Sequence, residues 1–525
     1  MSQAGFTAPH YLASQTGMQV LQDGGSAIDA MVAAAACIAV VYPHMNSLGG
    51  DGFWLIQRQG EAPVAIDACG PAAQLVNPDG YTSDTLPARG TAACITQGGT
   101  VSGWQRAREY LSQWRQPLPL SELFEDAITY CETGFSVSES FVNASHKILS
   151  QGGVNDAFKQ TYTRGGEPLS NGDTLVNPEL ANSFRHLAQA DLNAFYQGDI
   201  GQRIYQYFET CDSPLAAADF MNFSAQYVEP LSVVTSRATL YNLPAPTQGI
   251  ASLLILAIYD RLYQASWNEA LQIHYLVEAT KLAFQIRNRY VVDPADLTQD
   301  LNHFLDADYV HQLSDQISSS SVLPWPHTAL PGDTVWMGAV DHEGTLVSFI
   351  QSIYWEFGSG VVIPDTGVLW NNRGVSFSLD KNDSNYLRPG RKPRHTLNPA
   401  MAVFNDGKRM AYGTMGGEGQ PQTQAAFFNR YVYQQQSLAD AIAAPRWLLG
   451  RAWGDQSHNL KLEAELMQTE GTALQSIGHD LTEVPGCNEL MGHAGAVVLD
   501  KQQRVSVATD PRSDGAALIS ESGNG

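Results

Sequence analysis

Positive charge is scarce in this 525-residue sequence: 30 lysines and arginines stand against 53 aspartates and glutamates, which gives a net charge of −23 at pH 7. Such a chain is repelled by nucleic acid and by anionic membrane surfaces, so we expect neither as a partner. Long apolar runs are also missing. The longest, residues 30–41, is too short to cross a bilayer and follows Asp29, so it is predicted to be a buried helix.

Cysteine is scarce as well. The six cysteines are scattered without a Cys-x-x-Cys pair, which argues against a zinc site or a disulfide framework and is typical of reduced thiols. Residues 1–7 lack the basic and apolar regions of a secretion signal, so we expect a cytoplasmic protein. His274 and Glu278 have the i,i+4 spacing of a metal pair, but their helix offers no third ligand. A surface contact is favoured there, and no metal or organic cofactor is expected.

Several segments carry clear secondary-structure signals. Residues 10–24 have helical spacing that stops at Gly24, Ser26 is placed to cap the helix that follows, and residues 55–66 indicate two strands around a polar turn. Helices are also predicted up to Ala190, at 250–264 and at 274–284. Residues 150–175 indicate a surface excursion, and 313–333 a flexible segment. The length predicts about two to four domains, although large α/β enzymes also form a single unit.

The stretch from residue 332 to 354 indicates a β-hairpin. Val335, Met337 and Ala339 alternate with their neighbours, a turn follows at 341–344, and β-forming residues resume up to Tyr354. Thr334 stands at the mouth of the first strand. From the residues alone, a threonine in this place is an ordinary strand residue, and spacing does not make it catalytic.

Several motifs together resemble the γ-glutamyltransferase family of N-terminal-nucleophile hydrolases. They are Asp333-Thr334, Phe357-Gly358-Ser359-Gly360 and Leu369-Trp370-Asn371-Asn372, with residues 24–30 and 48–53 near the start of the chain. The resemblance implies a four-layer αββα sandwich and a precursor that cuts itself between Asp333 and Thr334. The α chain would be residues 1–333 and the β chain 334–525, sharing one intertwined domain. Association of the processed heterodimers into a homo-oligomer is left open.

The resemblance also implies catalytic roles. Thr334 would be the nucleophile, and its α-amino group, once freed, would be the base, because its intrinsic pKa lies at about 7–8. Ser352 falls where the family has a second hydroxyl that holds the nucleophile. Gly416 and Gly417 match the oxyanion hole. By themselves these glycines fit a strand-to-helix turn equally well, but no P-loop or dinucleotide fingerprint surrounds them.

The substrate-binding positions depart from the family pattern. Tyr354 and Ser376 stand where the transferases have the Asn and Asp that grip a glutamate amino group, and no Arg lies between Pro71 and Pro87 to clamp its carboxylate. Arg373 replaces a Gln and offers a fork suited to a carboxylate. His395 and Thr396 occupy the places of two carboxylate-binding serines. The alternative for Arg373, His395 and Thr396 is that they are exposed loop residues.

Compared with the transferases, the expected pocket lacks the acidic partner of an ammonium group and has an additional cation, Arg373. These two differences predict a small anionic amide as the substrate. Within the family, the resemblance is greatest to enzymes that split oxamate into oxalate and ammonia in purine breakdown. A γ-glutamyl hydrolase or transferase and a β-lactam side-chain acylase are the alternatives within the family. A binding protein on an inactive hydrolase scaffold is the alternative outside catalysis.

Overall fold

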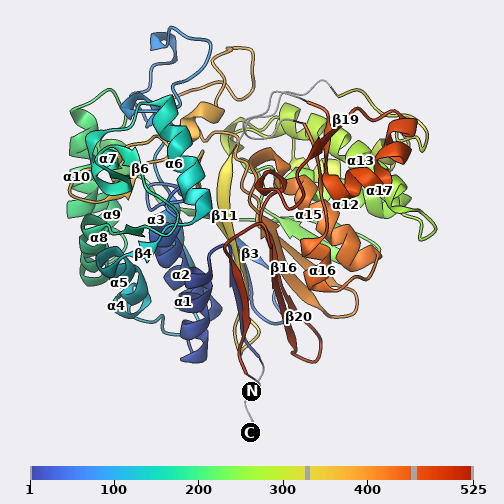
Figure 1. The fold of residues 1–525 in the computed structure, drawn as a ribbon, viewed down its shortest axis with the longest axis horizontal. Coiled ribbons are helices and arrows are strands. Elements are labelled where there is room, and N and C mark those ends of the chain that lie inside the picture. Colours follow the sequence, from blue (N-terminus) through green and yellow to red (C-terminus); the bar gives the residue numbers. More distant parts are fainter. Residues whose placement is uncertain (1–2, 326–331, 451–457, 522–525) are drawn as a thin grey trace.

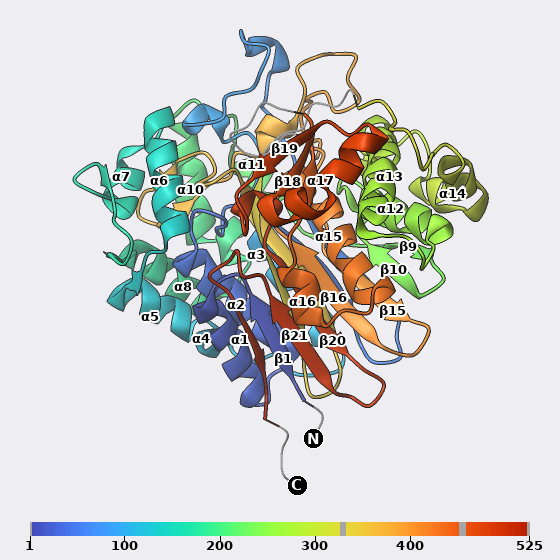
Figure 2. The same cartoon turned by 45° about the vertical axis from the view of Figure 1, so that its right-hand side comes forward.

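Two antiparallel sheets stack face to face at the centre of the molecule, with helices on both outer faces (Figure 1). The computed structural model describes residues 3–325, 332–450 and 458–521. Figure 2 shows α1 and α2 on one side of the sheets and α12 and α13 on the other. The expected four-layer αββα sandwich is therefore confirmed. Within the described ranges, no helix is both long and apolar enough to cross a membrane.

The seven-stranded sheet contains the predicted hairpin at its centre. Its strands, in spatial order, are β22 (Ala516–Ile519), β1 (Gly5–Ala8), β11 (Asp333–Val340), β12 (Leu346–Tyr354), β2 (Asp51–Gln57), β3 (Val64–Ala68) and β8 (Gln226–Val228). β11 pairs with β1 on one side and β12 on the other. The predicted hairpin at 332–354 and the strand pair around residues 55–66 are both confirmed.

The six-stranded sheet lies against the first. Its order is β21 (Val505–Thr509), β20 (Ala494–Leu499), β16 (Arg409–Thr414), β15 (Ala400–Phe404), β10 (Ala238–Asn242) and β9 (Leu231–Val234). A smaller sheet contains β17 (Trp447–Leu449), β18 (Leu460–Glu463) and β19 (Leu481–Val484), which lie between β16 and β20 in the sequence. Strands from before and after residue 333 are hydrogen-bonded neighbours in both large sheets.

The alternation of β11 places its side chains in two different cores. Val335 and Met337 join the core beneath the first helix layer, whereas Trp336 joins the core between the sheets. The Trp336 ring fits only because glycines face it: a Cβ on Gly413 would lie 2.2 Å from Trp336 Cδ1. The indole N–H donates to Ser348 Oγ at 2.9 Å. This packing fixes the strand on which Thr334 lies.

The first helix layer covers the seven-stranded sheet. Ser26 caps α2 through a capping box with Asp29, as expected, and every residue of α2 is buried. Tertiary packing on both sides of this helix explains why its sequence is apolar all round. The principal helices of the layer are α1 (Tyr11–Gln22), α2 (Ala27–Val41), α3 (Thr100–Leu111), α5 (Glu125–Thr133), α6 (Glu139–Gln151), α8 (Pro178–Ala190) and α10 (Asp199–Glu209).

The second helix layer covers the six-stranded sheet, and it corrects one expectation. Its helices are α12 (Gly249–Leu262), α13 (Glu269–Tyr290), α15 (Gln420–Phe428), α16 (Leu438–Ala443) and α17 (Ala464–Ile477). The surface contact expected for His274 and Glu278 is wrong, because both residues are 0% exposed. Neighbouring helices cover α13, and Glu278 forms an ion pair with Lys281 at 2.7 Å.

Two segments expected to be irregular are partly ordered. Residues 150–175 contain α7 (Asp156–Tyr162) and the short strands β5 (Thr163–Arg164), β6 (Glu167–Pro168) and β7 (Thr174–Leu175). The segment 313–333 begins at the end of α14 (Ala307–Ser314) and ends in β11. Its residues 326–331, which were expected to be flexible, lie outside the described ranges.

Candidate active site

Thr334 lies near the start of the central strand β11 and is 1% exposed. Gln420, the first residue of α15, donates from Nε2 to Thr334 Oγ at 3.4 Å. The Gln420 amide is itself oriented, because its Oε1 accepts from Asn398 Nδ2 at 3.1 Å. Sequence reasoning missed Gln420, since it stands 86 positions from Thr334 and has no motif of its own.

A side chain contacts the carbonyl group of Asp333, the residue before Thr334. Ser352 Oγ donates to the Asp333 carbonyl oxygen and accepts from the Tyr354 N–H at 2.7 Å. Ser352 therefore lies at the site, as expected, but its hydroxyl contacts the carbonyl rather than the Thr334 hydroxyl. A donor at this oxygen withdraws electron density from the carbonyl carbon next to the threonine.

The backbone around this bond is strained. The β11–β12 register shifts between Asp333 and Val335, Tyr354 has φ 84° and Phe357 has φ 56°. Left-handed conformations cost side-chain-bearing residues about 1–3 kcal/mol each, and they persist where the surroundings enforce them. One of them, Tyr354, is the strand partner of Asp333.

Gly416 and Gly417 form a left-handed turn between β16 and the 3-10 helix Gly417–Gly419 that leads into α15, with φ of 118° and 53°. Among the described residues, no acceptor pairs with either backbone N–H. A Cβ on Gly417 would lie 2.9 Å from the Gly332 nitrogen, so the segment before Thr334 packs directly on this turn. Two unpaired donors before a helix N-terminus are suited to stabilise an oxyanion.

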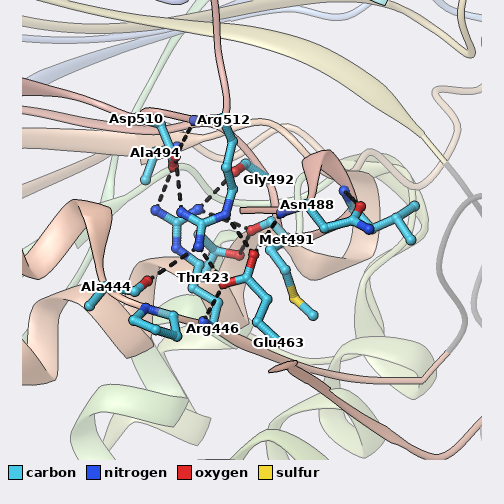
Figure 3. Close-up of polar contacts among 12 residues, drawn as sticks. Thr423, Ala444, Arg446, Glu463, Asn488, Met491, Gly492, Ala494, Asp510 and Arg512 are labelled. Atoms are coloured by element: carbon cyan, nitrogen blue, oxygen red, sulfur yellow. Dashed lines mark hydrogen bonds and ion pairs between the residues drawn. The ribbon is translucent and has the colours of Figure 1, made fainter. Parts of the chain in front are cut away.

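A buried network of ion pairs holds the segment around Gly492, which lies next to this turn (Figure 3). Arg446 pairs with Asp510 at 2.5 Å, and Arg512 pairs with both Asp510 and Glu463. Arg446 Nη1 also donates to the Gly492 carbonyl at 2.7 Å. Gly492 lies 3.6 Å from the position of a Cβ on Gly416. The network thereby fixes the segment against which the glycine turn rests.

A small cavity of about 40 Å³, here called the cationic pocket, lies beside Tyr354. A buried water needs about 10–15 Å³, so the pocket has room for only a few non-hydrogen atoms. The expected residues Tyr354, Ser376, His395 and Thr396 all line it. The complete lining is Gln248, Arg287, Tyr354, Ser376, Arg394, His395, Thr396 and Glu418.

Arg373 does not line this pocket itself, but it contacts two residues that do, Tyr354 and Thr396. Arg287 forms an ion pair with Glu418 at 2.7 Å, and Arg394 donates to backbone carbonyls at 2.7 and 2.9 Å. The Arg373 guanidinium lies over the Tyr354 ring at 3.8 Å, and its Nη1 donates to Thr396 Oγ1 at 3.3 Å. Its Nη2 is buried without a partner among the described residues, so the solvent-facing alternative for Arg373 is wrong.

Two of the expected binding residues, His395 and Ser376, are already hydrogen-bonded to other groups of the protein. Both ring nitrogens of His395 are occupied: Nε2 lies 3.0 Å from Asp51 Oδ2, and Nδ1 accepts from the Leu397 N–H. Ser376 Oγ donates to the Arg373 carbonyl at 2.9 Å. The His395 ring is therefore not a free donor for a substrate. Burial raises the pKa of Asp51 to about 7, and the positive charge of Arg373 opposes that rise.

A larger cavity of about 240 Å³, here called the acidic cavity, lies on the Asp333 side. It holds the carboxyl groups of Asp333, Glu356 and Glu489 and the ammonium group of Lys147. Burial raises the pKa of all three carboxyls, and the charge of Glu356 raises that of Asp333 further. Its other lining residues include His44, Met45, Ser140, Gly332, Gly416, Glu418, Gly419, Leu448 and Leu490.

Two buried groups have side-chain atoms close enough together to hold a metal ion: Asp51, Cys69 and His395, and His274, Glu278 and His479. In each group the histidine is already bonded, His395 to Asp51 and His274 Nδ1 to His479 Nε2 at 2.8 Å. His479 is the third member that the helix sequence around His274 did not offer, and it comes from the end of α17.

The stacked sheets between two helix layers, with a buried threonine near the start of the central strand, have the fold of an N-terminal-nucleophile hydrolase. The chain belongs to the gamma-glutamyltranspeptidase family: residues 13–520 match the profile described as Gamma-glutamyltranspeptidase. It is an enzyme, an amidohydrolase of this family.

Known relatives span nearly the whole chain. The oxamate amidohydrolase proenzyme of Klebsiella pneumoniae subsp. pneumoniae is 47% identical over 512 residues, covering 97% of each chain. The glutathione hydrolase-like YwrD proenzyme of Bacillus subtilis is 36% identical over 515 residues, again covering 97% of each. Among solved structures, cephalosporin acylase from Bacillus halodurans superposes with a TM-score of 0.89 at 27% identity, covering 98% of this chain and 96% of that one.

Proposed function

We propose that the protein hydrolyses a small anionic amide, oxamate, to oxalate and ammonia, through an acyl-enzyme on Thr334. The observation that carries the proposal is the buried Arg373 guanidinium, whose Nη2 has no partner beside a cavity of about 40 Å³. A carboxylate of matching size would satisfy this nitrogen. The 47% identity to an oxamate amidohydrolase proenzyme supports the same substrate.

The enzyme would first cut itself. Thr334 Oγ attacks the Asp333 carbonyl carbon, Ser352 donates to the carbonyl oxygen as negative charge develops there, and the C–N bond breaks to leave an ester. That step already frees the Thr334 α-amino group, and water then hydrolyses the ester to give the Asp333 carboxylate and the free Thr334 hydroxyl. The products are an α chain of residues 1–333 and a β chain of 334–525, which stay together as one domain. The proenzyme names of the two relatives support this step.

In turnover, the α-amino group of Thr334 takes the hydroxyl proton as the oxygen attacks the amide carbonyl. The Gly416 and Gly417 N–H groups stabilise the oxyanion, while Arg373 and Thr396 hold the substrate carboxylate. The amine leaves with the proton as ammonia, and water hydrolyses the remaining acyl-enzyme to release oxalate. Asp51 and His395 fix the floor of the pocket rather than contact the substrate.

A γ-glutamyl hydrolase or transferase is the first alternative, and a β-lactam side-chain acylase is the second. A γ-glutamyl substrate needs a counter-charge for its α-ammonium group. The acidic residue of the cationic pocket is Glu418, and that carboxylate already pairs with Arg287. Ser376, at the other expected position, is uncharged. We therefore favour the anionic amide.

The decisive experiment is ammonia release from oxamate by purified protein, with Thr334→Ala as the blank and a γ-glutamyl anilide assayed alongside. We expect ammonia from the wild type alone and no turnover of the anilide. Anilide hydrolysis without ammonia would reject the oxamate assignment and favour a glutamyl site. A cytoplasmic location is part of the proposal, supported by six cysteines that are all free thiols.

A further inference from the structure

The acidic cavity and the cationic pocket adjoin each other at the reacting centre. Gly416 lines the acidic cavity, Tyr354 lines the cationic pocket and Glu418 lines both. Gly332 lies at the junction: it lines the acidic cavity, and a Cβ on it would be 3.0 Å from Tyr354 Cε2. A substrate whose amide bond is held at Gly416 would therefore place one half of the molecule in each cavity.

Glu356 presents an unpaired oxygen to the acidic cavity. The residue is 8% exposed, and its Oε1 lies 3.3 Å from Lys147 Nζ. Its Oε2 has no hydrogen-bond partner among the described residues, and neither has the buried Nδ1 of His44 on the same lining. A buried carboxylate oxygen without a donor is strongly destabilised, so these atoms mark a place for a donor supplied by a ligand.

The charges of the acidic cavity favour a cation. The cavity is lined by the carboxyl groups of Glu356 and Glu489, with Asp333 as a third, and by one ammonium group, that of Lys147. Burial raises the pKa of both glutamates, and their mutual repulsion adds to the rise for Glu489. A cation bound between them would relieve this cost. Burial lowers the pKa of His44 well below its usual range, so that ring adds no positive charge.

Part of the remaining lining is apolar, beside the polar residues Ser140, Asn143 and Asn488. Met45, Leu448 and Leu490 face the same cavity. A ligand that combines an ammonium group with a short methylene stem would match both parts of the lining, since the stem can pack on apolar side chains while the charged end meets a carboxylate. Ammonia alone would fill little of about 240 Å³.

We propose that the acidic cavity binds the leaving half of the substrate and that this half is an alkyl amine ending in an ammonium group. The substrate class is an N-(aminoalkyl) amide of a small dicarboxylic acid, with its carboxylate at Arg373 and its ammonium at Glu356. The inference rests on the proposed function, because it assumes the same acyl half and the same nucleophile.

The reaction balances with one water. The Thr334 oxygen forms the acyl bond, the amide C–N bond breaks, and the hydroxyl proton passes through the α-amino group to the leaving nitrogen. Water then splits the ester, regenerating the hydroxyl and releasing the dicarboxylate. The second product is a diamine in place of ammonia. No oxidant, reductant or further reactant is needed.

The test compares two oxamates of equal length in wild-type enzyme: N-(3-aminopropyl)oxamate, which carries the ammonium, and N-butyloxamate, which does not. Oxalate release is measured for both and for unsubstituted oxamate. We expect kcat/KM for the aminopropyl compound to exceed that for the butyl compound about tenfold, the effect of one charge-assisted hydrogen bond. Glu356→Gln should reduce this ratio to about 1–3.

The ratio is taken within each variant, so that a general change in activity cancels. Glu343→Gln, at a side chain that is 60% exposed, is the matched control and should keep the wild-type ratio. Glu489→Gln provides a second test should Glu356→Gln not fold. A wild-type ratio near 1, with oxamate still hydrolysed, would overturn this inference alone. If Glu356 instead serves the Thr334 α-amino group, Glu356→Gln would lower all three activities and leave the ratio unchanged, which also overturns it. Failure to hydrolyse any of the three would reject the proposed function and this inference with it.

Discussion

At the scale of single residues, the site is defined by polar atoms that the protein leaves without partners. Arg373 Nη2, the Tyr354 hydroxyl and Glu356 Oε2 are buried and unpaired among the described residues, although most buried polar groups in proteins are hydrogen-bonded. Gln420 and Asn398, by contrast, form a satisfied chain that ends on Thr334 Oγ. The first set fits groups that await a ligand, and the second fits groups that hold the Thr334 hydroxyl, the proposed nucleophile.

The binding of oxalate should depend on pH through Asp51. Its pKa is raised to about 7, so below pH 7 Asp51 is neutral and the charge of Arg373 is available to the ligand. Above pH 7 the ionised Asp51 attracts the guanidinium, and we expect the Kd for oxalate to rise about 3–10-fold. Calorimetric titration between pH 6 and pH 9, chosen to span that pKa, measures it.

Two variants control this prediction. Asp51→Asn should make the Kd independent of pH, and Arg373→Ala should weaken oxalate binding about 10–100-fold at every pH while leaving self-cleavage intact. A pH dependence that survives in Asp51→Asn would assign it to another group. Wild-type oxalate affinity in Arg373→Ala would remove Arg373 from the site.

At the scale of elements, the site depends on how β11, β12 and the start of α15 meet. The hairpin supplies Thr334 and Ser352, and the turn between β16 and α15 supplies Gly416, Gly417 and Gln420. Strand pairing fixes the first set. Packing of Gly332 on the glycine turn fixes the distance between the two sets.

Gly417→Ala should block self-cleavage. Its φ of 53° disfavours a side chain, and the new Cβ would lie 2.9 Å from the Gly332 nitrogen, so the segment before the scissile bond must move. We expect the rate of cleavage, followed on denaturing gels, to fall about 100-fold, the effect of misplacing reacting groups by about 1 Å.

Gly407→Ala is the matched control for that variant. Gly407 also has a positive φ, 89°, but a Cβ there would meet only Lys501 Cβ at 3.7 Å. It should cost about 1–2 kcal/mol of stability and leave cleavage unchanged. Equal cleavage rates in the two alanine variants would contradict the role given to the Gly417 turn.

Arg446→Met should destabilise the protein by about 3–5 kcal/mol. The Arg446 side chain is fully buried, and its loss leaves the buried Asp510 with only Arg512 as a charged partner and the Gly492 carbonyl without its donor. Urea unfolding in a Thr334→Ala background, where every chain is uncut, measures the change.

The control for Arg446 is Arg504→Met, which removes an exposed pair with Asp500, since the Arg504 side chain is 74% exposed. We expect Arg504→Met to lower the free energy of unfolding by about 0–1 kcal/mol. If Arg446→Met lowers the free energy of unfolding as little as Arg504→Met does, the ion network contributes little to holding the Gly492 segment against Gly416.

At the scale of the whole molecule, the two parts of the chain on either side of residue 333 cannot form separate cores. In the seven-stranded sheet β11 lies between β1 and β12, and in the six-stranded sheet β15 pairs with β10. The core between the sheets includes Phe53 from one part and Trp336 and Met401 from the other. Cutting one peptide bond removes none of these contacts.

The cut enzyme should therefore remain a single particle. In proportion to their lengths, the fragments of the 57.0 kDa chain have masses of about 36 and 21 kDa. We expect them to co-elute in gel filtration and to separate only in denaturant, while Thr334→Ala gives one uncut band. Separate elution of the fragments under native conditions would contradict the shared core.

Resemblance predicted the sandwich, and local pattern predicted the hairpin at 332–354 and the capped buried helix after Ser26. Alternation and capping are local, so the sequence by itself determined these elements. Only the tertiary structure decided which groups meet: His395 bonds to Asp51, 344 positions away, Gln420 reaches Thr334, and Glu418 pairs with Arg287. The physical reason is that a hydrogen bond depends on distance in space, which sheet and helix packing set, and no short-range spacing in the sequence records it.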